Sequence, residues 1–359
     1  MQTQSKGLNF EGQSIYVGFD VHLKSWQVTI LTENMFHKTF VMPPSPKVLS
    51  SYLRDNFPEG TYYSAYEAGF SGLWAHYQLN ALGVNNIVVN PADIPTTQKE
   101  KVQKEDKRDS RKIARSLRSG ELTPIYIPSE STLDDRALVR ARSMLVGDMT
   151  RFKQRIKSFL YFYGITFPQE FERRSTHWSG RFMTWLDGIS MKEESGRQAL
   201  DTLVEEARNQ RKLLLETTKK VKKMSEGVKY SERVALLRSI HGIGLTNSMV
   251  ILTEAEDFKR FPRDEKFASY VGLIPTSHSS GDKEKMGEIT FRSHNFLRKA
   301  FIESAWIAVR FDPALLMAYQ ALCKRMEPND AIVRIAKKLL NRVYFVLKNK
   351  KKYECNKVK

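Results

Sequence analysis

The first 130 residues alternate short apolar runs with amphipathic stretches. Three apolar runs follow one another at hairpin-like distances and predict a meander of strands at 15–20, 26–31 and 37–42. Helices and strands are then expected to alternate, with a helix at 47–57, a strand at 61–66, a helix at 72–82 and a strand at 86–89. A meander followed by alternating helices and strands predicts a mixed α/β domain over residues 1–130.

The periodicity becomes helical over residues 131–229. The stretch 133–163 has frequent apolar residues, many basic residues and no proline. Across 196–227, side chains recur at alternating three- and four-residue steps, a heptad seam with two polar members: Leu200, Leu203, Ala207, Gln210, Leu214, Thr217, Val221 and Met224. Two long helices are therefore predicted to form a coiled-coil-like connector. Its seam packs either on the rest of the chain or on a second copy.

Residues 230–347 predict a mainly α domain, because short helical patterns are interrupted there by glycine and proline. The tail, 348–359, is basic and is expected to be solvated, with phosphate contact as the second interpretation. The two cysteines, Cys323 and Cys355, lie far apart without the spacing of metal ligands. The sequence therefore predicts neither a disulfide nor a zinc site.

Charge favours a polyanionic partner. Lysine and arginine number 58 against 40 acidic residues, for a formal net charge of +18. Each basic contact to phosphate releases a counterion, which favours such a partner. Nucleic acid is favoured over a membrane surface, because no apolar run approaches about 20 residues and the basic residues are spread along the chain. The polar N-terminus lacks a charged-then-apolar signal segment, which predicts cytoplasmic residence.

Acidic residues stand where predicted strands end. Asp20 and Glu67 each close a strand, and Asp106 and Asp109 would share one face of a helix. Four carboxylates at one crevice suit Mg²⁺, which neutralises phosphate charge and polarises the oxygens of an in-line displacement. Glu105 and Asp93 are alternative acids. The surrounding bases would receive a phosphate backbone: Lys104, Lys107, Arg108, Arg111 and Lys112. The acid order on this pattern resembles the RuvC and ribonuclease-H-like nuclease fold.

A second candidate site is a loop bounded by Gly272 and Gly281 that contains three serines ahead of a basic helix. A serine hydroxyl can attack phosphorus once a base such as His278, Lys283, Lys285 or a neighbouring metal removes its proton. The alternative interpretation is a flexible polar loop without chemistry. The expected phosphate contacts around it are Lys283, Lys285, Arg292, Arg298 and Lys299.

A glycine-rich turn precedes that loop in the sequence. Gly242-Ile243-Gly244 leads into an apolar helix and resembles a helix-hairpin-helix, whose amides can hold a phosphate. A tight turn that simply needs glycine is the alternative, and the two interpretations are compatible.

These segments together resemble the IS110 family of transposases over nearly the whole chain. The stretch from Tyr16 to His22, the Tyr66-Glu67-Ala68 step and the later acid pair resemble its RuvC-like DEDD domain. The C-terminal motifs that resemble its serine-bearing domain are Gly242-Ile-Gly, Tyr270-Val-Gly-Leu-Ile-Pro, His278-Ser-Ser-Gly and Asn295-Phe-Leu-Arg. One departure is Asp282, where many relatives have a second glycine.

The resemblance implies a mechanism and partners. Asp20, Glu67, Asp106 and Asp109 would bind Mg²⁺, and Ser280, with Ser279 as the fallback, would form a phosphoserine with DNA. A structured noncoding RNA would guide the protein to donor and target DNA. Dimers or tetramers would bring the serine of one protomer to the carboxylates of another. Two alternatives stay open: a hydrolytic RuvC-like nuclease or junction resolvase, and a nucleic-acid-binding protein without enzymatic activity.

Overall fold

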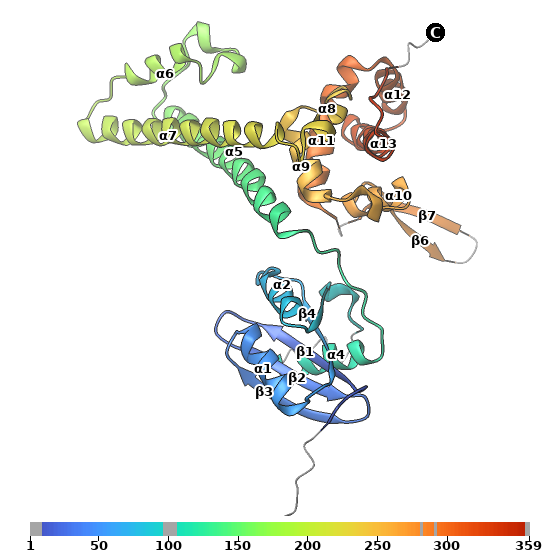
Figure 1. Ribbon diagram of the computed structural model, residues 1–359. Coiled ribbons are helices and arrows are strands. Elements are labelled where there is room, and N and C mark those ends of the chain that lie inside the picture. The colour runs from blue at the N-terminus through green and yellow to red at the C-terminus, as the bar shows by residue number, and fades with distance from the viewer. Residues whose placement is uncertain (1–8, 96–105, 281–282, 291–292, 356–359) are drawn as a thin grey trace, which may run out of the picture. The chain divides into compact units, whose positions relative to one another are not determined.

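The computed structural model describes residues 9–95, 106–280, 283–290 and 293–355 (Figure 1). The side chains of 106–107, 276–280 and 283–289 lie outside this description. The chain separates into two compact units, Met1–Ile127 and Pro128–Lys359. Each unit is described below by itself.

A mixed five-stranded sheet forms the centre of the first unit, in the order β3-β2-β1-β4-β5. Its strands are β1 (Ser14–Val21), β2 (Trp26–Thr32), β3 (Phe36–Met42), β4 (Thr61–Glu67) and β5 (Asn85–Val89). The first three strands pair antiparallel, whereas β4 runs parallel to β1 and β5 parallel to β4. This arrangement confirms the predicted ribonuclease-H-like α/β fold.

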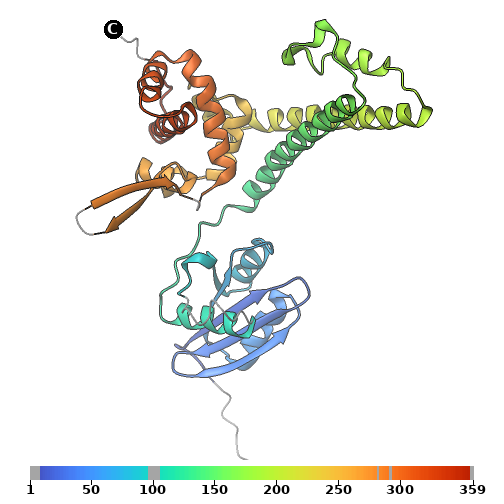
Figure 2. The same ribbon diagram turned by 180° about the vertical axis from the view of Figure 1, so that it is seen from behind.

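Helices cover both faces of the sheet. Helices α1 (Pro46–Asn56) and α2 (Trp74–Ala81) pack on one face, where alternate β1 residues such as Val17 and Phe19 meet Leu49 and Leu79 in a buried core. Helix α4 (Asp106–Arg118) covers the opposite face, where its Ile113 packs against Ala65 of β4. Accordingly, α1 lies in front of the sheet in Figure 1 and α4 lies in front of it in Figure 2.

A helical arm begins the second unit. Helices α5 (Glu130–Phe162) and α7 (Glu194–Ser225) pack against each other, with the short α6 (Gly180–Asp187) between them in sequence. They run antiparallel: Ile156 shares a core with Val204, and Arg142 donates to the Thr218 hydroxyl at 3.1 Å. The heptad-like face of α7 therefore packs on α5 of the same chain.

Six further helices share one large apolar core with part of the arm. They are α8 (Ser231–Arg238), α9 (Leu245–Ala255), α10 (Asp264–Val271), α11 (Asn295–Phe311), α12 (Pro313–Cys323) and α13 (Pro328–Asn349). This mainly helical region confirms that part of the fold prediction. Within the described residues, no helix is both long and apolar enough to cross a membrane.

The serine-bearing segment is a β-hairpin, so the prediction of a loop was wrong. Strands β6 (Pro275–Ser280) and β7 (Lys283–Ile289) pair antiparallel, with Ser279 opposite Glu284 and Ser280 opposite Lys283. Figure 1 shows the hairpin extending away from the helices. The sequence of the hairpin is almost entirely polar. The two strands are held together by main-chain hydrogen bonds, so an alternation of apolar residues could not predict them.

The glycine turn joins α8 to α9 at a crowded position. Gly242 has a φ of +89°, and a Cβ on it would lie 2.3 Å from the carbonyl oxygen of Ser304 in α11. Glycine is required there by both the left-handed backbone and the close approach of α11. The turn thus has a structural reason for its glycine that is independent of any phosphate.

Candidate active site

Sheet register brings two of the predicted acids level with each other. Ser14 to Gly18 of β1 pair in parallel with Thr61 to Ala65 of β4, at a constant offset of 47 residues. The same offset carried two residues further sets Asp20 beside Glu67. Adjacent strands lie about 4.8 Å apart, so the two carboxylates, at the C-terminal ends of neighbouring strands, share one local environment.

Both acids face α4. Side chains alternate along a strand, and Gly18 and Ala65, two residues before each acid, lie on the α4 side. A Cβ on Gly18 would lie 2.3 Å from the Ser110 carbonyl oxygen, because the helix backbone rests directly on β1. The buried Ser110 hydroxyl also meets the Thr29 hydroxyl of β2 at 2.9 Å. Glycine at position 18 therefore permits the helix to cover the strand that bears Asp20.

Helix α4 directs its N-terminus toward these acids. Near its C-terminus, Arg118 donates to the Thr32 carbonyl oxygen, which lies opposite the first residues of β1. The helix consequently runs antiparallel to β1, and its first turn lies toward the Asp20 end. Asp106 is the first residue of α4 and Asp109 lies within its first turn. The backbone thus carries all four predicted acids at one end of the sheet, although the Asp106 side chain lies outside the described residues.

Asp20 and Asp109, the two predicted aspartates whose side chains are described, each have a basic neighbour. Nε2 of His22 lies 3.0 Å from Oδ2 of Asp20, and Nζ of Lys112 lies 3.3 Å from Oδ1 of Asp109. The Asp20 side chain is 27 % exposed to solvent and the Asp109 side chain is 21 % exposed. A cation that binds Asp20 would therefore compete with the imidazole for the carboxylate, while solvent still reaches the site.

The donor atoms at the C-terminal ends of β1 and β4 fit a hard divalent cation, because all the predicted ligands are carboxylates. Their spacing is wider than that of bound ligands, however. Among the described side chains, the one group of three metal-ligating atoms within 4.8 Å of one another lies elsewhere, in the second unit. Asp20, Glu67 and Asp109 would each supply an oxygen only after local side-chain movement.

The predicted basic contacts differ in how the structure engages them. Arg108 is exposed on α4, whereas the Arg111 guanidinium lies 4.8 Å from the Phe36 ring centre and bonds Thr39. Arg298 donates to the Thr290 carbonyl oxygen at 2.6 Å, and burial lowers its pKa. Lys299 is exposed and forms a 3.8 Å ion pair with Glu303. Lys104 and Arg292, and the side chains of Lys107, Lys283 and Lys285, lie outside the described residues.

The two candidate serines occupy the last positions of β6, and their side chains lie outside the described residues. The base of their hairpin is well defined. His294 donates its backbone N–H to the Tyr270 carbonyl oxygen at 3.2 Å, and the two rings lie 5.3 Å apart. Gly272, at a φ of +80°, permits the close approach of Ser293, because a Cβ there would lie 2.2 Å from that side chain.

A buried ion cluster connects this base to the arm. Glu254 of α9 is 1 % exposed. Its carboxylate oxygens form ion pairs with Nε of Arg140 at 2.7 Å and with Nε of Arg136 at 3.2 Å. Nε2 of His294 lies 3.1 Å from the same carboxylate. Burial alone would raise the pKa of Glu254, but the hydrogen bonds from His294 and Arg140 and the charge of Arg136 lower it to about 2. The carboxylate is therefore ionised at neutral pH and holds α5, α9 and α11 together.

Sequence reasoning missed His22 and the Glu254 cluster. A usable signal existed for His22, because residues two apart in extended chain project to the same side, and His22 follows Asp20 by two residues directly after the end of β1. The ion cluster carried no such signal. Arg136 and Arg140 lie on α5, Glu254 lies on α9 and His294 directly precedes α11, so only the tertiary fold makes them neighbours.

Family models match two parts of the chain. Residues 17–165 match a model described as a transposase, of the IS110 DEDD type. Residues 234–320 match a model described as the transposase IS116/IS110/IS902 family. The first match contains the whole set of predicted carboxylates and implies a metal-dependent active site. The second contains the glycine turn and the serine hairpin.

Individual relatives agree with these models. The y4qE protein of Sinorhizobium fredii is 29 % identical over 284 residues, which cover 78 % of this chain and 66 % of that protein, just under two thirds. The transposase for insertion sequence element IS1533 of Leptospira borgpetersenii is 28 % identical, over 69 % of this chain and 71 % of that protein. The pilin gene-inverting protein of Moraxella bovis is 32 % identical over 34 % of this chain and 39 % of that protein.

Proposed function

Because this chain belongs to the IS110 family of transposases, which are enzymes of DNA transposition, we propose that it cuts and rejoins DNA strands through a covalent phosphoserine. Ser280 is the proposed nucleophile, with Ser279 as the alternative. Asp20, Glu67, Asp106 and Asp109 are the proposed ligands of Mg²⁺. The supporting observation is the parallel register of β1 and β4, which sets Asp20 beside Glu67 on the face that α4 covers.

The chemistry divides between the two sites. Bound Mg²⁺ would neutralise the scissile phosphate and polarise its oxygens. The serine hydroxyl loses its proton to a base, its oxygen bonds to phosphorus, and the strand's own P–O bond breaks to release a hydroxyl. A hydroxyl on the incoming strand then attacks the phosphoserine, restores a phosphodiester and frees the serine. Rejoining needs no external energy source, because the phosphoserine ester conserves the free energy of the broken phosphodiester bond.

Rejoining is favoured over hydrolysis by one comparison. The Moraxella relative is named for inverting a gene, and inversion requires that cut strands be joined again. A hydrolytic nuclease would leave them open. The second candidate, a RuvC-like hydrolase in which the hairpin only binds DNA, therefore remains the alternative that experiment must exclude.

Two further parts of the proposal concern partners. A structured noncoding RNA would supply sequence recognition by base pairing, while the basic protein contacts backbone and shape. The net charge of +18 supports a nucleic-acid partner of either kind. The active form would be a dimer or tetramer in which the serine of one protomer meets the carboxylates of another.

Covalent trapping tests the proposal. Cells carrying the chain together with its natural flanking DNA are lysed in denaturant, and DNA ends attached to the protein are sequenced. Wild type should give adducts, and Ser280→Ala should abolish them. Ser277→Ala, on the same strand, is the matched control and should retain them. Loss of adducts with Ser279→Ala instead would move the nucleophile by one residue.

The carboxylate half is tested in parallel. Asp20→Asn should abolish both adducts and recombination, because it removes a negative ligand with little change of volume. If wild type yields no adduct while divalent-cation-dependent nicking persists, the hydrolytic alternative is correct and the phosphoserine proposal fails.

A further inference from the structure

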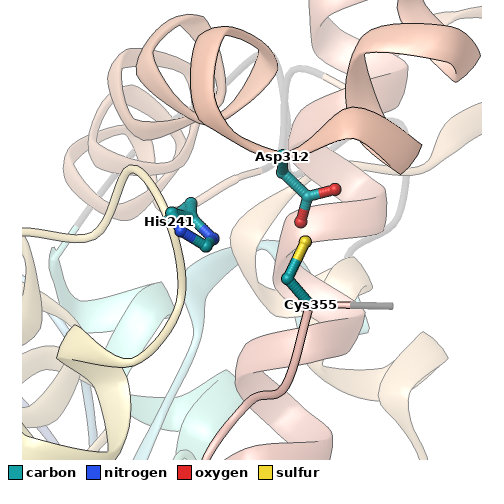
Figure 3. A group of neighbouring side chains, drawn as sticks. All are labelled: His241, Asp312 and Cys355. Carbon is teal, nitrogen blue, oxygen red and sulfur yellow. The ribbon is translucent and has the colours of Figure 1, made fainter. Parts of the chain in front are cut away.

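Three potential metal ligands lie close together in the second unit, and none of them belongs to the predicted carboxylate site of the first unit. They are His241 in the α8–α9 turn, Asp312 at the α11–α12 corner and Cys355 in the tail beyond α13. One imidazole nitrogen, one carboxylate oxygen and the sulfur all lie within 4.8 Å of one another. Figure 3 shows the thiol and the imidazole directed toward the carboxylate from different segments.

The carboxylate is the fixed member of the group. Asp312 is 1 % exposed, and its side chain accepts the Leu315 N–H at 3.1 Å and the Tyr353 hydroxyl at 2.8 Å. It also forms an ion pair with Arg342, which is itself only partly exposed. Although burial opposes ionisation, these contacts lower the pKa of Asp312, so a carboxylate stands here at neutral pH.

The other two ligands are positioned but adjustable. Next to His241, Gly242 rests on the α11 backbone, which sets the turn beside the Asp312 corner. The tail is held at Tyr353, whose N–H donates to the Ser239 hydroxyl at 2.8 Å. His241 is exposed and Cys355 is half-buried outside regular structure, so both side chains have room to move.

We propose that His241, Asp312 and Cys355 bind a zinc-class divalent cation that fastens the C-terminal tail to the α8–α9 turn. Nitrogen, oxygen and thiolate donors together suit borderline ions such as Zn²⁺ and exclude Mg²⁺, which takes oxygen ligands. Bonds of about 2.0–2.3 Å require donor atoms roughly 3.5 Å apart, so atoms that lie within 4.8 Å of one another need to close by little more than about an ångström at most. The exposed imidazole side leaves the fourth position to water.

The charges around the group permit a cation. Asp312 and a Cys355 thiolate supply two negative charges, against which Arg342 is the positive group in direct contact. Arg342 already balances the buried carboxylate, so the thiolate formed on binding offsets part of the ion's charge. The released thiol proton makes binding pH-dependent, with weaker binding at lower pH.

Cobalt titration of the full-length protein, freed of tag and metal, tests the site. Co²⁺ should saturate at one ion per chain with a near-ultraviolet thiolate charge-transfer band, and Zn²⁺ should displace it. Cys355→Ser should abolish the band, and His241→Ala should weaken Zn²⁺ binding by at least about tenfold. Cys323→Ser is the matched control, because it removes the other half-buried thiol and should change neither result.

The opposite results overturn the proposal. A band that persists in Cys355→Ser, or no band in wild type, would place any bound ion elsewhere. Displacement of Co²⁺ by excess Mg²⁺ would do the same, because it would indicate an all-oxygen site. Circular dichroism of each variant establishes that the fold is retained, as expected for one exposed and one half-buried position.

Discussion

Replacing Glu254 with glutamine should weaken the second unit in a pH-dependent way. The change keeps the size of the side chain but removes the charge that binds Arg136, Arg140 and His294. The two arginines lie on α5, and His294 is the residue directly before α11. Without the carboxylate, the guanidinium groups of Arg136 and Arg140, which are neighbours on α5, would lose the negative charge that they share, and the arm would lose these ion pairs to α9.

The size of the effect follows from the pKa of Glu254, which falls from its ordinary 4.5 to about 2 in the folded protein. At about 1.4 kcal/mol per pH unit, this corresponds to about 3 kcal/mol of folding free energy at pH 7. A lowered folded-state pKa contributes stability above the unfolded value and loses it on acidification. The contribution is therefore complete above pH 4.5 and disappears as the pH falls toward 2.

Urea denaturation followed by helical ellipticity measures this prediction. At pH 7, Glu254→Gln should lower the free energy of unfolding by about 3 kcal/mol relative to wild type, and the difference should shrink steadily from pH 4.5 to pH 2.5. Glu303→Gln is the control, because its carboxylate is 57 % exposed and 3.8 Å from Lys299. A loss below 1 kcal/mol at pH 7, or one that is the same at pH 3, would refute the reasoning.

Three other changes have defined outcomes. Gly18→Ala would set a Cβ 2.2 Å from the backbone nitrogen of Ala114, so it should cost the first unit about 1–3 kcal/mol in thermal unfolding; Gly69→Ala, with nothing within 4 Å, should be neutral. Lys299→Ala should reduce the slope of log DNA affinity against log salt by about 1 if this exposed cation contacts phosphate, and an unchanged slope would remove it from the interface. Tyr353→Phe removes a hydrogen bond to the buried corner carboxylate and should cost about 1 kcal/mol, with faster proteolysis of the tail; equal proteolysis rates would contradict it.

The sequence was most informative where apolar side chains repeat. The β1 run, Ser14–Val21, buries every second residue against α1 and α2, so its strand period and its acidic end were both visible. The same holds for β4 and Glu67. The heptad pattern of α7 predicted a packed seam, but its partner could not be identified, because a period records only that a face is buried.

What the sequence hid is held together by contacts between distant segments. The β6–β7 hairpin has almost no apolar residues, so its strands lacked a detectable period. The ligands His241, Asp312 and Cys355 are separated by long intervals, and a search for local metal-ligand spacing passes over them. The neighbours of Cys355 depend on where the tail lies after the end of α13, which the spacing of the two cysteines does not record.

The paired strands β1 and β4 also determine which insertions and deletions this chain tolerates. The distance between Asp20 and Glu67 is set by main-chain hydrogen bonds across the sheet, not by the 46 residues that separate them in the chain. Insertions or deletions in the β2–β3 turn, or after α1, therefore leave the gap between the two acids unaltered. Homologues with quite different loop lengths can keep the same constellation, and a search for it should follow strand ends rather than a fixed count of residues.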